Sequence, residues 1–286
     1  MNEFSRNIST FIGCDCEYKD ASKVIFGAPF DGTTSYRPGT RFASQYIRNE
    51  SYGIETYSPY QDKDLEYIKV YDGGDLEFPF GNTEKVLSMI EGYETRVLED
   101  RKLPIMIGGE HLVTLGAVRA AVKKYPDLHI IHFDAHADLR DDYLGEKLSH
   151  ACVLRRCHDL VGDGRIFQFG IRSGERAEFG FAAEHTTMCK FDFAKLYEIC
   201  KQIKAPVYFT IDLDVLDSSV FPGTGTPEAG GVSFNQLIAA IITVGGLTNV
   251  VAADINELSP PYDPSGVSTA CACKTLRELL LAIKAN

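Results

Sequence analysis

Acidic and imidazole side chains recur at alternate positions in one short stretch of this sequence. Asp134, His136 and Asp138 are separated by single alanines and follow the apolar run Leu128–Phe133. In extended backbone, side chains at every second position share a face, so these three groups are expected to point the same way. Burying them at the end of a strand is costly unless something pairs them, and a divalent cation would do so. The stretch therefore predicts a metal site.

Three further apolar runs also end in polar motifs: Pro104–Ile107 leads into Gly108-Gly109-Glu110-His111, Val207–Ile211 into Asp212-Leu213-Asp214, and Asn249–Ile255 into Asn256-Glu257. Taken singly, His111 is typical of a turn or helix cap, and an Asp-x-Asp pair is typical of a solvated loop. Six such groups at three strand ends are better explained together by a metal. The predicted metal ligands are His111, Asp134, His136, Asp138, Asp212 and Asp214.

The ligand types indicate which metal to expect. Mixed Asp and His ligands without Cys suit Mn²⁺, with Fe²⁺, Co²⁺ and Zn²⁺ as alternatives. Four Asp and two His can hold two ions if some carboxylates bridge them. A metal lowers the pKa of its bound water from 15.7 towards ~7, which makes a nucleophile at neutral pH. The ligand set can therefore hold two divalent ions, among which it favours Mn²⁺, and it indicates a hydrolytic reaction.

Stretches typical of strands and of helices alternate along the chain. The expected strands are Val24–Pro29, Tyr67–Tyr71, Pro104–Ile107, Leu128–Phe133, Ile166–Ile171, Val207–Ile211 and Asn249–Ile255, and the expected helices are Thr83–Asp100, Leu112–Lys124, Phe193–Lys204, Phe234–Val244 and Lys274–Lys284. This alternation predicts one α/β domain over 1–286 with a central, mostly parallel sheet. Ligands bind beyond the carboxyl ends of the strands in such folds, where the polar motifs lie.

Composition excludes several other classes of protein. The chain has 286 residues, and its net charge of −11 argues against nucleic-acid binding. No apolar run approaches the ~20 residues of a membrane helix, and the N-terminus lacks a signal-peptide pattern. The eight cysteines, two pairs of them spaced C-x-C, are expected to be reduced, partly buried thiols rather than zinc or redox sites. These features predict a cytoplasmic enzyme.

The polar motifs resemble the ordered signature motifs of the ureohydrolase family, which includes arginase and agmatinase. The matching stretches are Gly108–His111, Asp134–Asp138, Ser149-His150 and Asp212–Asp214, and the resemblance runs from about Val24 to Leu280. Three others, Ser35–Arg41, Gly223–Pro227 and Glu257–Asp263, look more like the agmatinase branch. The resemblance implies a three-layer α/β/α fold around an eight-stranded parallel sheet, and assembly as trimers or hexamers.

The resemblance also implies how two Mn²⁺ ions would be held. The first ion would take His111, Asp134, Asp138 and Asp212, and the second Asp134, His136, Asp212 and Asp214. Asp134 and Asp212 would then bridge the ions, and Asp138 would also orient the bridging hydroxide.

In the expected reaction, that hydroxide attacks a guanidinium carbon and urea is released. Glu257 would pair with the guanidinium, because a carboxylate accepts that planar group with two charge-assisted hydrogen bonds. His150 would shuttle protons to the leaving amine. Alternatively, Glu257 is a surface carboxylate before a Pro-Pro turn, and His150 starts a helix that Ser149 caps.

The expected substrate is a small cationic guanidino compound, agmatine first, which would give putrescine. Guanidinobutyrate or another ω-guanidino compound is the alternative, then arginine. Ala151 follows His150 where the family often has glycine, and Cys152–Arg156 lacks the polar loop by which arginase grips an α-amino acid. In a helix starting near Ser149, Arg155 and Arg156 would lie almost two turns further on. Ser218 stands where relatives often carry proline, so Asp217 is expected to be structural.

Two other classes compete with a ureohydrolase. A metal-dependent deacetylase shares the broad fold but would use one catalytic metal, and His136 and Asp214 argue against it. A regulatory homologue without turnover would be expected to have lost ligands, and all six are present.

Overall fold

The computed structural model describes residues 9–284. Its centre is an eight-stranded sheet in the order β4-β1-β5-β10-β9-β6-β7-β8, and every neighbouring pair is parallel. The strands are β1 (Lys23–Gly27), β4 (Val70–Asp75), β5 (Leu103–Ile107), β6 (His129–Phe133), β7 (Ile166–Ile171), β8 (Thr187–Lys190), β9 (Pro206–Asp212) and β10 (Asn249–Asn256). A two-stranded ribbon, β2 (Tyr57–Ser58) with β3 (Lys63–Asp64), lies outside this sheet.

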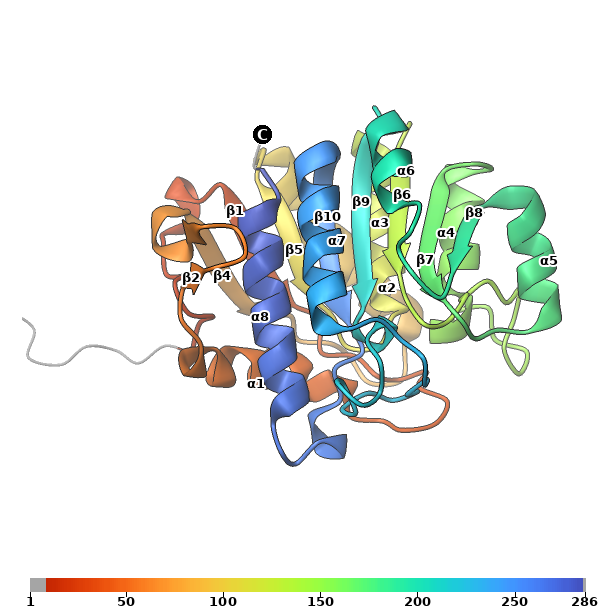
Figure 1. Ribbon diagram of the computed structural model, residues 1–286, viewed down its shortest axis with the longest axis horizontal. Coiled ribbons are helices and arrows are strands. Elements are labelled where there is room, and N and C mark those ends of the chain that lie inside the picture. Colours follow the sequence, from red (N-terminus) through yellow and green to blue (C-terminus); the bar gives the residue numbers. More distant parts are fainter. Residues whose placement is uncertain (1–8, 285–286) are drawn as a thin grey trace, which may run out of the picture.

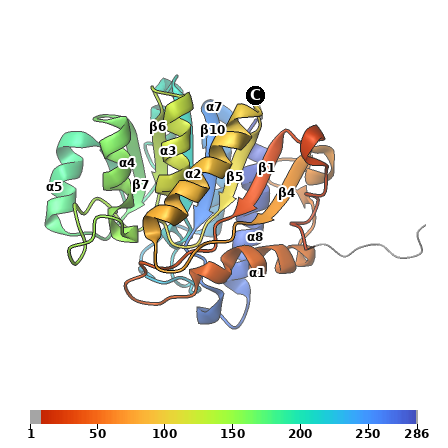
Figure 2. The ribbon, with the colours of Figure 1, turned by 180° about the vertical axis from the view of Figure 1, so that it is seen from behind.

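Helices cover both faces of the sheet (Figures 1 and 2). One layer holds α6 (Leu196–Gln202), α7 (Phe234–Leu247) and α8 (Val267–Ala282), with α1 (Ala43–Glu50) packed against α8. The other holds α2 (Thr83–Glu99), α3 (Val113–Lys124) and α4 (Val153–Val161), and α5 (Arg176–His185) lies beside the edge strand β8. The predicted three-layer α/β/α architecture is confirmed.

The sheet is buried on both faces, and most positions of its central strands are apolar. In β5, Ile105 and Ile107 belong to the core under α7 and α8, whereas Met106 belongs to the core under α2 and α3. Successive strand side chains point to opposite faces, so a strand covered on both sides must be apolar throughout. This explains why the sequence showed continuous apolar runs instead of alternation.

Some elements differ from the sequence-based expectation. Strand β8 and helices α1, α4 and α5 were not predicted. Strand β8 is short and only partly buried, and the three helices have 8, 9 and 10 residues. The predicted strand Tyr67–Tyr71 is wrong in its first half, because a 3₁₀ turn occupies Leu65–Tyr67 before β4 begins. Helix α8 begins at Val267 rather than Lys274. The missed helices are shorter than the window of about 11–18 residues over which apolar periodicity is recognised in a sequence.

The strand order explains how distant motifs meet. The four motif-bearing strands β5, β10, β9 and β6 are neighbours in the centre of the sheet. Because all run in parallel, their carboxyl ends lie on one edge, the lower edge in Figure 1. The polar motifs at 108–111, 134–138, 212–214 and 256–257 therefore converge there.

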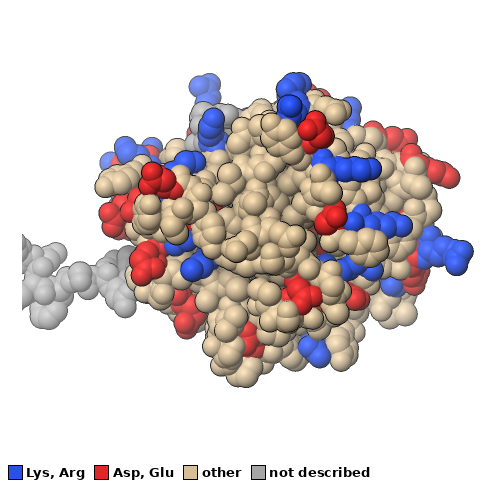
Figure 3. Space-filling model, in the orientation of Figure 1, with Lys and Arg blue, Asp and Glu red and all other residues tan. Residues whose placement is uncertain are grey.

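The surface shows no single-sign patch on the face drawn in Figure 3. Lysine and arginine are interspersed with aspartate and glutamate around its margin, while its centre, over α7 and α8, carries few charges. Among the described helices, none has the length and apolarity needed to span a bilayer. All eight cysteines are free thiols.

Candidate metal centre and active site

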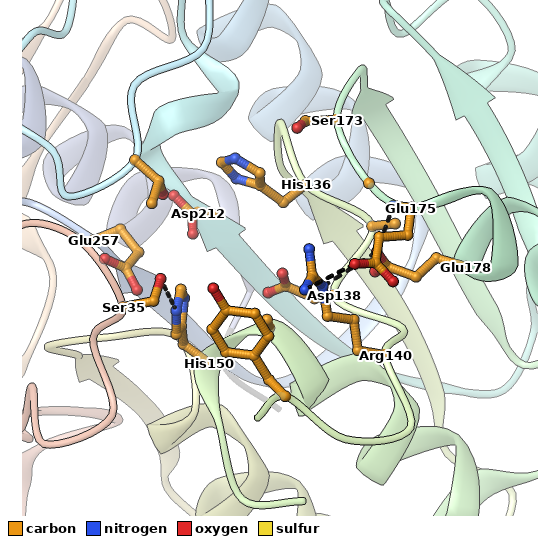
Figure 4. Close-up of a pocket in the computed structure, with 15 residues that line it drawn as sticks. Ser35, His136, Asp138, Arg140, His150, Ser173, Glu175, Glu178, Asp212 and Glu257 are labelled. Carbon is orange, nitrogen blue, oxygen red and sulfur yellow. Dashed lines mark hydrogen bonds and ion pairs between the residues drawn. The ribbon is translucent and has the colours of Figure 1, made fainter. Parts of the chain in front are cut away.

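A cavity opens at the carboxyl edge of the sheet. His136, Asp138 and Asp212 line its floor, and Glu257 and His150 line one side (Figure 4). The predicted catalytic residues and metal ligands therefore share one site, which is the arrangement that the motif positions required.

The imidazole of His111 lies at the centre of one ligand set. Its Nδ1 is 3.1 Å from Asp134 Oδ2, 3.2 Å from Asp138 Oδ2 and 3.4 Å from Asp212 Oδ2. All four side chains are buried. These four residues are the set that the family resemblance implies for the first ion.

The imidazole of His136 marks a second ligand set beside the first. Its Nδ1 is 3.0 Å from Asp214 Oδ2 and 3.5 Å from Asp134 Oδ1. The two oxygens of Asp134 thus face different histidines, His111 and His136. Asp134 is therefore placed to bridge two ions, and Asp134, His136 and Asp214 offer ligand atoms within 4.8 Å of one another.

The buried carboxylates need positive charge. Burial, followed by repulsion from Asp134, raises the pKa of Asp138 to about 7. Burial, followed by repulsion from Asp214 and Asp134, raises the pKa of Asp212 well above its usual value. Bound cations would reverse both effects, because an opposite charge favours the ionised carboxylate. The donor set of oxygen and imidazole ligands therefore fits divalent cations.

The backbone differs from the extended chain that the spacing suggested. Strand β6 ends at Phe133, and Asp138 has a φ of 53°, in the left-handed region. Such a conformation costs of order 1–3 kcal/mol in a residue other than glycine and is common at functional sites. The expectation that Asp134, His136 and Asp138 share the face of one strand is wrong. A turn brings Asp138 back towards His111.

His132 and Gln168 are functional candidates that sequence reasoning missed. His132 Nε2 is 2.8 Å from Asp134 Oδ2, and Gln168 Nε2 is 3.1 Å from His132 Nδ1 and 2.8 Å from the Ala137 carbonyl. The Gln168 amide nitrogen only donates, so His132 Nδ1 accepts and its Nε2–H donates to Asp134. The sequence offered one indication of a role for His132, which is its position two residues before Asp134.

A second set of hydrogen bonds orients His111. Its Nε2 is 2.8 Å from Thr210 Oγ1 of β9, which leaves Nδ1 facing the carboxylates. Thr210 Oγ1 lies 3.4 Å from Thr114 Oγ1, and Thr114 donates to Asp254 Oδ2 at 2.8 Å. Partners of this kind fix the orientation of a metal-binding imidazole.

His150 lies at the start of a 3₁₀ turn, His150–Cys152, that leads into α4. Its Nε2 is 2.9 Å from Ser35 Oγ, and its backbone N–H donates to Thr33 Oγ1 at 3.1 Å. Thr33 in turn donates from its backbone N–H to Glu110 at 2.8 Å. His150 is therefore held at the cavity wall by the loop that follows β1 (Figure 4).

Glu257 is buried beside the predicted metal ligands and is not a surface carboxylate. Its Oε1 accepts the backbone N–H of His111 at 2.7 Å, and no hydrogen bond from the described residues reaches Oε2. Burial, together with the nearby charge of Glu110, raises the pKa of Glu257 well above its usual value. A cationic ligand would offset that shift.

The outer wall of the cavity carries opposed charges. Arg140 Nη1 is 3.2 Å from Glu175 Oε1, its Nε is 3.6 Å from Glu178 Oε2, and its guanidinium lies 4.6 Å from the ring centroid of Tyr143. Arg140 is therefore already paired. Outside the cavity, Arg155 stacks 3.8 Å over Phe181.

Asp217 has the structural role that the sequence predicted. Its Oδ2 accepts the backbone N–H groups of Gly230 and Gly231 at 2.7 and 3.0 Å, and its Oδ1 accepts the N–H of Ser219 at 3.0 Å. Asp217 thus fixes the loop between β9 and α7, which carries Thr226 to the cavity.

Comparison with known proteins agrees with this geometry. A model of the Arginase family matches residues 21–282. This chain belongs to the arginase family. It is a hydrolase of the class that cleaves the C–N bonds of linear amidines.

Individual arginase-family relatives resemble the chain over nearly its full length. It is 47% identical to an agmatinase of Halalkalibacterium halodurans and 46% identical to one of Bacillus subtilis, and each alignment covers 95% of both chains. The agmatine ureohydrolase of Thermoplasma volcanium has a TM-score of 0.89 and 35% identity, with 98% of this chain and 95% of that chain covered.

Proposed function

We propose that this arginase-family enzyme hydrolyses agmatine to putrescine and urea with two Mn²⁺ per chain. The observation that carries the proposal is Glu257, whose free Oε2 lies in the same cavity as two overlapping sets of metal ligands. A buried carboxylate with one oxygen free can accept a charge-assisted hydrogen bond from a guanidinium. The agmatinases among its relatives support the same substrate.

The proposed ligands combine the two sets around the histidines with the family resemblance, which adds Asp212 to the second set. His111, Asp134, Asp138 and Asp212 would hold one ion, and Asp134, His136, Asp212 and Asp214 the other. When bound, the ions would supply Lewis-acid activation of a water molecule, lowering its pKa from 15.7 towards ~7.

Two side chains of the protein, those of Glu257 and His150, would bind the substrate and transfer the proton. Glu257 positions the guanidinium through Oε2 while its Oε1 stays on the His111 N–H. His150 carries a proton to the leaving amine, and its hydrogen bond with Ser35 sets the orientation of the imidazole. The imidazole can take up and release a proton, and because burial lowers the pKa of His150 to about 4, the ring is neutral and ready to accept one at pH 7.

The outer wall supports a cationic substrate tail. Glu175 and Glu178 supply two carboxylates against the single guanidinium of Arg140, which leaves net negative charge near the mouth. The carboxylate of arginine would lack a free cation there, and an unpaired buried carboxylate is costly. We expect kcat/KM for agmatine to exceed that for arginine by at least about 10²-fold.

Urea release over a panel of guanidino compounds tests the substrate. Agmatine, guanidinobutyrate and arginine are compared at saturating Mn²⁺, each with its own kcat/KM. Agmatine is expected to be fastest. If guanidinobutyrate is hydrolysed faster than agmatine, agmatine is not the preferred substrate, although the type of reaction stays the same.

The family resemblance further supports assembly of the chain into trimers or hexamers. Sedimentation velocity on the metal-loaded protein measures the mass directly, and a monomer would contradict this part of the proposal.

A further inference from the structure

A second group of imidazole and carboxylate side chains lies away from the cavity. His158 of α4, Asp163 in the loop after it and His185 at the end of α5 offer ligand atoms within 4.8 Å of one another. Asp163 Oδ1 is 2.8 Å from His158 Nε2 and 2.7 Å from His185 Nδ1. One carboxylate oxygen therefore faces both imidazoles.

This group lies on the opposite edge of the sheet from the catalytic cavity. Asp163 precedes β7 and His185 precedes β8, so both lie at the amino-terminal ends of strands. The ends of α4 and α5 lie at the same edge, the upper edge in Figure 1. The group therefore shares no residue with the proposed dimetal centre.

Packing holds both imidazoles in place. The His185 ring centroid is 4.2 Å from that of Phe181, and the His158 centroid is 4.9 Å from it. Arg155 stacks on the same Phe181 ring at 3.8 Å. The two imidazole rings are thus oriented before any ligand binds. Preoriented side chains favour binding because they lose less conformational entropy when the ligand binds.

We propose that His158, Asp163 and His185 form an accessory site for Zn²⁺ or a similar divalent transition ion. Two imidazoles and one carboxylate are a common protein ligand set for zinc, with a fourth position left for water. Ligand atoms around a tetrahedral zinc ion lie roughly 3.3 Å apart, so each contact to Asp163 must open by about 0.5 Å. The side chain of Asp163 is 70% exposed, so its carboxylate is free to make that movement.

The site differs in its preference from the catalytic centre. Imidazole-rich sites bind Cu²⁺, Ni²⁺ and Zn²⁺ far better than Mn²⁺. The four-carboxylate cavity is the better site for Mn²⁺. Occupation of the accessory site would join the ends of α4 and α5 without altering the residues that line the cavity.

Zinc stoichiometry tests this proposal. Metal-stripped wild type, His158→Gln, Asp163→Asn and His185→Gln are dialysed against a series of Zn²⁺ concentrations, and bound zinc per chain is measured. His129→Gln is the matched control, because His129 begins β6 at the same edge of the sheet but lies outside the group. The dimetal centre contributes equally in all five proteins, so differences report the accessory site.

Wild type and the His129→Gln control are expected to bind one more Zn²⁺ per chain than each of the three variants. If a variant still binds Zn²⁺ at this site, its affinity for Zn²⁺ is expected to be at least about 10-fold lower. A loss of about 10-fold is the lower end of the range for removing a residue that only supports a metal ligand. Urea release with Mn²⁺ should be the same in all five. Equal zinc binding by wild type and the three variants would show that Asp163 only accepts two hydrogen bonds, and would overturn the proposal.

Discussion

The Nε2–H of His132 donates to Oδ2 of Asp134 at 2.8 Å, and Asp134 is the carboxylate that both predicted metal-binding histidines face. Gln168 fixes this direction by donating to the other nitrogen of His132. The hydrogen bond leaves Asp134 ionised: burial opposes its ionisation, but the neighbouring histidines lower its pKa well below the usual value. The orientation of the proposed bridging ligand is thus set by two buried residues that do not line the cavity.

Replacing Gln168 with leucine is therefore expected to weaken Mn²⁺ binding. The variant removes the donor to His132 Nδ1, so the imidazole can take the other tautomer and turn away from Asp134. Loss of such a partner typically costs 10–100-fold in metal affinity. Equilibrium dialysis measures the affinity. His129→Gln, on strand β6 with His132, is the control. Unchanged Mn²⁺ affinity in Gln168→Leu would show that Gln168 does not position Asp134 through His132.

Asparagine at Asp134 or Asp212 is expected to be more damaging than any other single substitution among the predicted ligands. Each is proposed to bridge, so each change weakens both ions at once. Asp192→Asn is a surface control, since Asp192 accepts only the backbone N–H of Ala194. Metal analysis and urea release are measured together. Near-normal rates in either variant would show that the assignment of bridging ligands is wrong.

His150→Asn is expected to lower kcat by roughly 10²–10⁴-fold, the usual range for general acid–base catalysis. Metal content should be unchanged, because His150 contacts Ser35 and not the ligands. Ser35→Ala should give a smaller loss, about 5-fold, since one neutral hydrogen bond contributes about 1 kcal/mol. Loss of metal from His150→Asn would instead make His150 a ligand or a structural support.

The environment of His150 also predicts how stability of the metal-free protein depends on pH. Burial, with the nearby His136 and His111, lowers the pKa of His150 from 6.5 to about 4. When the pKa of a histidine is lower in the folded state than in the unfolded state, its contribution to stability is fully present above the unfolded-state pKa. That contribution is lost as the pH falls towards the folded value.

The wild type should therefore lose stability relative to His150→Asn between pH 6.5 and about 4. Above pH 6.5 the difference in free energy of unfolding should be constant. Urea denaturation of both metal-free proteins across this range gives the difference directly. A constant difference at every pH would mean that burial does not suppress protonation of His150.

Much of the fold could be predicted because the central strands are apolar on both faces. Ile166–Ile171 was predicted with its exact bounds, and β5, β9 and β10 to within a residue or two. Helix α4 was missed because it has only 9 residues and Arg155, Arg156 and Asp159 separate its apolar residues along the sequence, so its apolar stripe was overlooked. The stripe was nevertheless there, since Val153, Leu154, Cys157 and Val161 are the buried residues of this helix.

The site was predictable by residue type and less so by geometry. The six proposed ligands converge because their strands are adjacent, an order that no local pattern encodes. The left-handed backbone at Asp138 and Glu257 was not foreseen, because neither residue type requires it. The support of His132 by Gln168 depends on the pairing of β6 with β7, which is a tertiary feature.

The central claim, hydrolysis of agmatine by a two-metal centre, is tested most directly by titrating the metal-stripped enzyme with Mn²⁺ while urea release from agmatine is measured. The two ligand sets around His111 and His136 predict that the rate rises until two Mn²⁺ are bound per chain and then stays constant. A maximal rate with one bound ion, or no urea from agmatine at any Mn²⁺ content, would contradict the account.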